Sequence, residues 1–161
     1  MNEFQQNARR RRTPRRLLLL GLLCALLAAC GGSSPSASRA AVRAVLRSFL
    51  HAVAKGNGRV ACGHGTPAGQ QKIVAALGPE LQNFDIYGCD DVVYVTGAQM
   101  SRANRLRLET ARITRVELDG SHATVPLASL TSPHGPISTE LGKVGPIRLV
   151  ESYGVWLITA L

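Results

Sequence analysis

The sequence predicts an α+β fold, in which a long N-terminal helix and short helices pack on an antiparallel sheet. Apolar side chains recur at helical spacing in residues 39–55. Alternating apolar and polar side chains surround an Asp-Gly pair in residues 111–129, and residues 147–159 have the pattern of a final hairpin. Together, the helical pattern and the two strand patterns indicate the mixed class.

Residues 1–29 have the order of a secretory signal peptide. Six arginines lie within residues 9–16, and the following thirteen residues, 17–29, carry no charge and end in small side chains. This apolar run is shorter than the roughly 20 residues that a helix needs to cross a bilayer. We therefore expect the segment to direct export and to be removed, by either the general secretory or the twin-arginine route.

The four residues Leu27-Ala28-Ala29-Cys30 resemble the lipobox of bacterial lipoproteins. The resemblance implies cleavage before Cys30, lipidation of its sulfur, palmitate among the acyl chains, and anchoring at the extracytoplasmic face of the cell membrane. One acyl chain binds membranes marginally, whereas two or more anchor a protein stably. Two alternatives remain open, namely an ordinary secretory signal with a chance cysteine and an uncleaved signal anchor formed by residues 17–29.

The net charge of +9 belongs largely to the leader. Without residues 1–29 the chain keeps thirteen basic and nine acidic residues, and the basic ones form no block that would suit a polyanion. We therefore do not expect a nucleic-acid partner. The remaining length suffices for one domain. The predicted organisation is a signal peptide 1–29, a lipidated Cys30 with a flexible Gly/Ser/Pro linker in 30–38, and a domain 39–161.

Two of the four cysteines, Cys62 and Cys89, lie within the predicted domain. An exported domain meets an oxidising compartment, where an even pair of cysteines is most simply a disulfide. Their Cα atoms should then lie within about 7 Å of each other. Closing a loop of this length should stabilise the fold by about 3 kcal/mol.

Residues 39–55 are predicted to form the long N-terminal helix. Ser38 is a suitable N-cap, and Gly56-Asn57-Gly58 can end the helix through left-handed conformations. The apolar face consists of Val42, Val45, Leu46, Phe49, Leu50 and Val53. We expect His51, on the rim of this face, to be a solvated side chain and not a ligand. The basic positions elsewhere on the helix are Arg39, Arg43, Arg47, His51 and Lys55.

A second helix is predicted to start with Thr66 as N-cap and Pro67 at its first position, and to stop at Gly78-Pro79. The long helix, the Gly-Asn-Gly turn, the cysteine just ahead of Thr-Pro, the short helix and the second cysteine resemble exported bacterial lipoproteins of the nuclear transport factor 2-like superfamily. The resemblance spans about residues 39–161 and implies a cone, in which a strongly curved antiparallel sheet wraps around helices. The chain departs from that pattern at residues 63–65, where it has Gly-His-Gly.

Residues 85–100 allow two interpretations. Val92 to Thr96 favours a strand by residue type, whereas Asp90-Asp91 can begin a helix, which the resemblance also favours. The superfamily includes ketosteroid isomerases and dehydratases, which use a carboxylate base beside a Tyr or His. The side chains of these types in the middle of the chain are Asp85, Tyr87, Asp90, Asp91 and Tyr94. None of them matches an enzymatic motif, so no catalytic residue is assigned.

Asp119-Gly120 is predicted as the two-residue loop of a hairpin. This loop opposes Glu117 to His122 as a solvent-side pair, Val116 to Ala123, and Thr114 to Val125. The predicted buried face consists of Val116, Leu118, Ala123, Val125 and Leu127.

Residues 131–145 form a connection rich in Pro, Gly and Ser, with the length of a mobile loop or lid. After it, residues 147–151 and 155–159 are predicted as a hairpin that turns at Ser152 to Gly154. Trp156 is expected in the core.

No motif assigns a metal, a cofactor or a nucleophile. Cys62-x-His64 lacks further ligands at recognisable spacing, and a thiolate nucleophile conflicts with an oxidising compartment. The other histidines, which supply no such spacing, are His51, His122 and His134. The sequence thus predicts a lipid-anchored, non-enzymatic binding or accessory module for a protein or small apolar ligand; the alternative is an isomerase or dehydratase that uses the cone cavity.

Overall fold

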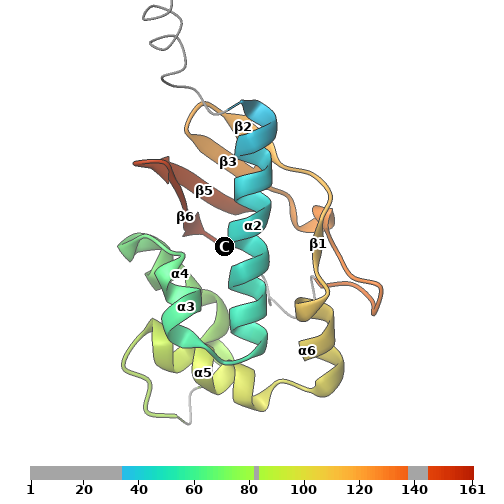
Figure 1. The fold of residues 1–161 in the computed structure, drawn as a ribbon. Helices are drawn as coiled ribbons and strands as arrows, with labels where there is room; N and C mark the ends of the chain where they lie inside the picture. Colours follow the sequence, from blue (N-terminus) through green and yellow to red (C-terminus); the bar gives the residue numbers. More distant parts are fainter. Residues whose placement is uncertain (1–33, 82–83, 138–144) are drawn as a thin grey trace, which may run out of the picture. The chain divides into compact units, whose positions relative to one another are not determined.

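The described residues combine five α-helices with two antiparallel sheets that do not close, which confirms the α+β class (Figure 1). This computed structural model describes residues 34–81, 84–137 and 145–161. They belong to a unit, Ser34–Leu161, that is distinct from Met1–Ser33. The predicted signal peptide and Cys30 lie outside the described residues. Residues 138–144 of the predicted connection also lie outside them.

Helix α2, Pro35–Ala54, starts four residues earlier than predicted. Ser34 is its N-cap and accepts the backbone N–H of Ala37 at 3.3 Å, while Ser38 is buried inside the helix. Proline at the first helical position has a preorganised φ angle, and this favours the earlier serine as the cap. The last part of the predicted linker, from Pro35 on, is therefore helical. The fully buried side chains of the predicted apolar face are Val42, Leu46, Phe49, Leu50 and Val53.

Two short helices follow the C-terminal end of α2. Helix α3 spans Gly58–Gly63 and was not predicted; helix α4 spans Pro67–Leu77, as predicted. Asn57 caps α3 and Thr66 caps α4, each by accepting a backbone N–H of the first turn, at 3.3 and 3.0 Å. Helix α4 packs on the last strand, and Gly69 is the residue of closest approach.

Of the two interpretations of residues 85–100, the helix is correct. Helix α5 spans Cys89–Gln99 and buries its first two valines completely. A short 3-10 helix, η1 (Pro79–Leu81), precedes it, and helix α6 (Arg102–Glu109) follows it with Ser101 as N-cap.

The larger sheet has the order β2-β3-β5-β6, and the smaller sheet pairs β1 with β4. All pairs are antiparallel. Figure 1 shows α2 lying alongside the larger sheet, with the other helices gathered near its C-terminal half. A second 3-10 helix, η2 (Leu127–Ser129), links β3 to β4. The strands are β1 Arg112–Ile113, β2 Glu117–Asp119, β3 His122–Val125, β4 Leu130–Thr131, β5 Ile147–Ser152 and β6 Val155–Ala160.

The predicted register of the first hairpin is wrong by two residues. The loop is Gly120-Ser121, so that Asp119 opposes His122 and Glu117 opposes Thr124. Gly120 has a φ of 56°, and the first loop position is where a type II′ turn requires glycine. Because strand side chains alternate with a period of two, the slip leaves each residue on its predicted face. The buried members of that face are Val116, Ala123 and Val125.

Other pairings predicted for this hairpin also change. Thr114 lies outside the strands, and its backbone N–H donates to the carbonyl of Ser129 at 2.9 Å. Glu117 forms an ion pair with Arg115 at 2.8 Å instead of facing His122.

The final hairpin forms as predicted. Strands β5 and β6 meet at Tyr153-Gly154, whose φ angles of 51° and 78° are those of a type I′ turn. Tyr153 is fully exposed at the tip, whereas Trp156 is buried in the core, as expected.

Gly69 allows a direct test of the contact between α4 and β6. A Cβ atom at Gly69 would overlap the carbonyl oxygen of Ile158, whereas a Cβ at Gly63 would meet open space. Gly69→Ala should lower the free energy of unfolding by about 1–2 kcal/mol, because overpacking outweighs the better helix propensity of alanine. Gly63→Ala, the matched control, should leave stability unchanged or slightly higher. Urea unfolding measures both, and equal stabilities would contradict the close approach of α4 to β6.

Candidate functional site

The two cysteines of the predicted domain are bonded to each other. The Cα atoms of Cys62 and Cys89 are 6.1 Å apart, within the expected limit. The bond joins α3 to the first residue of α5, and Cys62 is buried in the core. Next to it, a Cβ at Gly58 would overlap the backbone of Asp90, so the two helices lie in close contact. The disulfide therefore fixes where α5 begins.

The acidic and tyrosine candidates lie on α5 and on the chain that leads into it. Asp85 and Asp90 are exposed, and the carboxylate of Asp91 accepts the backbone N–H of Tyr87 at 3.1 Å. Tyr87 is 90% exposed and Tyr94 is 65% exposed. Carboxylates in a first helical turn interact favourably with the helix dipole.

These candidates do not form the acid–base pair that an isomerase would need. Among the described residues, the buried polar side chains are Ser38 and Ser129, and no carboxylate lies beside a tyrosine or histidine in the core. The arrangement at the start of α5 is that of a solvated helix start with Asp90 and Asp91 in its first turn.

His64 faces a serine and not a metal ligand. Its Nε2 lies 2.8 Å from the Oγ of Ser48 on α2, and partial burial lowers the pKa of His64 below its usual value. Its backbone carbonyl accepts the N–H of Ile158, and Gly65 forms a β-bridge with the same strand residue, so residues 64–65 pack against β6. Cys62 is committed to the disulfide. Within residues 34–81, 84–137 and 145–161, no group of three or more His, Cys, Asp or Glu is placed to hold a metal.

Two arginines of α2 bind backbone carbonyls across the fold. Arg39 donates to Val116 at 3.4 Å, and Arg43 donates to Ile113 at 3.1 Å and to Thr114 at 3.4 Å. These hydrogen bonds satisfy backbone carbonyl groups in the stretch of chain from the end of β1 to the start of β2. They give both arginines a structural role.

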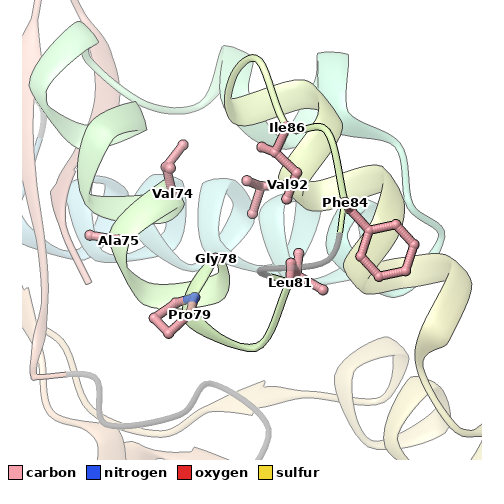
Figure 2. Close-up of a pocket in the computed structure, with 8 residues that line it drawn as sticks. All are labelled: Val74, Ala75, Gly78, Pro79, Leu81, Phe84, Ile86 and Val92. Carbon is pink, nitrogen blue, oxygen red and sulfur yellow. The ribbon is translucent and has the colours of Figure 1, made fainter.

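An apolar groove lies between α4 and the chain that leads into α5, and it is the strongest candidate site of the described residues. Its volume is about 370 Å³. Figure 2 shows residues of α4 on one side, Phe84 and residues near α5 on the other, and Leu81 of η1 between them. The lining residues are Val74, Ala75, Gly78, Pro79, Leu81, Phe84, Ile86 and Val92.

The groove has a closed floor and an exposed rim. Leu81 and Val92 are buried, whereas Ala75 and Pro79 are exposed and the Phe84 side chain is 45% exposed. The volume lies in the range of about 300–1,000 Å³ that is usual for ligand sites. All lining residues are apolar or glycine. The site can bind apolar groups, but it offers no side chain for acid–base or nucleophilic chemistry.

The sequence prediction missed this groove. The one signal that could have indicated it was the number of apolar side chains in residues 79–88. This stretch has too few helical or strand features to assign those side chains to a core.

Comparison with known proteins gave no match to a protein-family model, to a curated protein or to a solved structure. In the part of the chain that the structure describes, no helix has both the length and the apolar character needed to span a membrane.

The disulfide should contribute strongly to stability. Replacing both Cys62 and Cys89 with alanine should lower the free energy of unfolding by about 3–4 kcal/mol, since the bond closes a loop with a sequence separation of 27. Urea unfolding with and without reductant measures this loss. Reductant should destabilise the natural chain and leave the double variant unchanged. A natural chain insensitive to full reduction would contradict a stabilising bond.

The His64 environment predicts a pH dependence. The folded state lowers the pKa of His64 because burial disfavours the charged form, so unfolding favours proton uptake. Stability should therefore be full above pH about 6.5 and fall as the pH drops below it. His64→Asn should flatten this dependence in chemical unfolding between pH about 5.5 and 7.5. His122→Asn, at an exposed histidine, should keep it; the same slope in both variants would contradict the assignment.

Proposed function

We propose that the chain is an exported lipoprotein, held through acyl chains on Cys30 at the extracytoplasmic face of the cell membrane. The observation that carries this proposal is the order of the leader: arginines, thirteen uncharged residues and then Leu-Ala-Ala-Cys. The disulfide between Cys62 and Cys89 supports export, because such bonds persist in oxidising compartments. A diacylglyceryl group supplies the two chains needed for stable anchoring.

The domain itself is proposed to act as a non-enzymatic binding or accessory module. The groove between α4 and α5 supports binding, because it is apolar and reachable from solvent. The isomerase or dehydratase alternative needs a carboxylate of raised pKa next to a hydroxyl or imidazole donor. No arrangement of that kind occurs in the core of the described residues, so no observation favours an enzyme.

We further propose that the fold is a variant of the nuclear transport factor 2-like cone. Support comes from the long helix α2 lying alongside a four-stranded antiparallel sheet, and from Trp156 of the last strand in the shared core. The short helix α4 and the two cysteines follow the sequence order on which the resemblance rests. The second two-stranded sheet, β1 with β4, is a departure from a single continuous sheet.

The position of the groove fits a tethered binding module. The chain enters the domain at Ser34, at the N-terminal end of α2, and a 20-residue helix is about 30 Å long. The β2–β3 hairpin lies near that end, whereas α5 packs close to Gly56 at the other end. Helices α4 and α5, between which the groove lies, are therefore in the half of the domain away from the start of α2 (Figure 1).

Mass spectrometry of the native protein tests the anchor. The N-terminus should be Cys30 carrying acyl mass, and Cys30→Ala should accumulate as the uncleaved precursor or leave the membrane fraction. Cys24→Ala, within the apolar run, is the matched control and should be processed and anchored normally. A natural chain that begins at Met1 without acyl mass would refute the proposal, as would a Cys30→Ala variant that stays membrane-bound at mature size.

A further inference from the structure

The groove lies in a segment whose charge differs from the rest of the chain. Residues 73–101 contain four acidic residues and no Lys, Arg or His, although the whole chain has 19 basic and 10 acidic residues. Every residue that lines the groove falls within this segment. The side chains of Asp85 and Asp90 are exposed and adjoin, in sequence, Phe84 and Cys89. The segment that lines the groove therefore carries a net negative charge, and the nearest basic residues in sequence are Lys72 before it and Arg102 after it.

The same segment exposes aromatic side chains. Phe84 lines the groove at 45% exposure, and Tyr87 and Tyr94 are still more exposed. Protein interfaces combine an apolar centre, enriched in aromatic residues, with a polar rim. An apolar groove with neighbouring tyrosines and carboxylates has this composition.

The chemistry of the lining distinguishes between classes of ligand. A small-molecule site normally has a few polar groups that converge on the ligand, and here the eight lining residues are apolar or glycine. Nucleic acids and anionic lipid surfaces would be repelled by the nearby carboxylates. A polypeptide with apolar side chains on one side and basic side chains next to them matches both the groove and its charge.

We propose that the groove binds an amphipathic segment of a partner protein, with apolar side chains between α4 and α5 and Lys or Arg side chains facing Asp85 and Asp90. This rests on the proposed function only in treating the groove as a binding site. The disulfide contributes by fixing the start of α5, which carries Val92 of the groove floor. Electrostatic complementarity of this kind sets orientation and speeds association.

The probe is a labelled synthetic helix of about 18 residues, long enough to form a helix on binding, with leucines on one face and lysines elsewhere. A second peptide replaces every lysine with glutamate and keeps the leucines. Fluorescence anisotropy is measured on the native full chain in phosphatidylcholine nanodiscs, with empty nanodiscs as the blank. The lysine peptide should bind at least about tenfold more tightly than the glutamate peptide, and added salt should reduce the difference.

Substitutions then locate the binding surface. Phe84→Ala and Ala75→Arg, both at exposed groove positions, should each weaken binding of the lysine peptide about tenfold. The double variant Asp85→Asn with Asp90→Asn should weaken it severalfold and reduce its salt dependence. Its matched control is Glu117→Gln with Asp119→Asn on β2, and the control for Phe84 is Tyr153→Asn at the β5–β6 tip. Both controls should bind like the natural chain.

Two results would overturn this inference. One is equal binding of the lysine and glutamate peptides, which would remove the role of charge. The other is unchanged binding by both Phe84→Ala and Ala75→Arg, which would remove the groove. Membrane anchoring through Cys30 is measured separately, so failure of the binding proposal and failure of the lipoprotein proposal are distinguishable.

Discussion

The burial of one face of α2 is the constraint on which the rest of the fold depends. Most of its large apolar side chains are fully buried, with Val45 partly buried, and the helix contacts α3, α5 and α6 as well as strands of both sheets. Burying one such side chain stabilises a fold by about 1.5–3 kcal/mol. Because helices and strands share this single core, displacing α2 would remove its contacts with both and leave the packing of α4 on β6 as a remaining contact between the helices and the larger sheet. Arg39 and Arg43 extend its role, since they bind carbonyls of the chain between β1 and β2.

Elements with a strong periodic pattern could be predicted from the sequence, and those held by distant contacts could not. The apolar stripe of α2, the Thr66-Pro67 start of α4 and the final hairpin all have local signals. Helix α6 lacks such a stripe, because Leu108 is its buried residue and its other residues are largely Arg and Asn. Strands β1 and β4 have two residues each, and only their pairing across the chain defines them. The hairpin register failed for a local reason, because Gly120 occupies the first loop position and not the second.

The candidate site shows the same division. The cysteine count predicted the bond between Cys62 and Cys89, since a single pair of cysteines in the predicted domain allows one intramolecular partnership. Residue type alone made the Asp and Tyr side chains near α5 candidates for acid–base chemistry, but such chemistry depends on burial, and Tyr87 and Asp90 are exposed. The groove could not be predicted from the sequence, because predicting it requires knowing which elements meet in space. Val74 and Phe84 become neighbours of one cavity only after α4 and α5 pack together.

The exposed groove and the disulfide are physically connected. Apolar side chains that remain in contact with water, such as Phe84 and Tyr87, contribute little to the free energy of folding, and none of residues 84–88 is fully buried. Local stability follows the number of buried contacts, and a segment with few of them would open readily. The bond from Cys89 to α3 restrains one end of this segment, and Leu81 in the core restrains the other. An open apolar surface can thus persist beside a closed core, which is the condition that a preformed binding groove must meet.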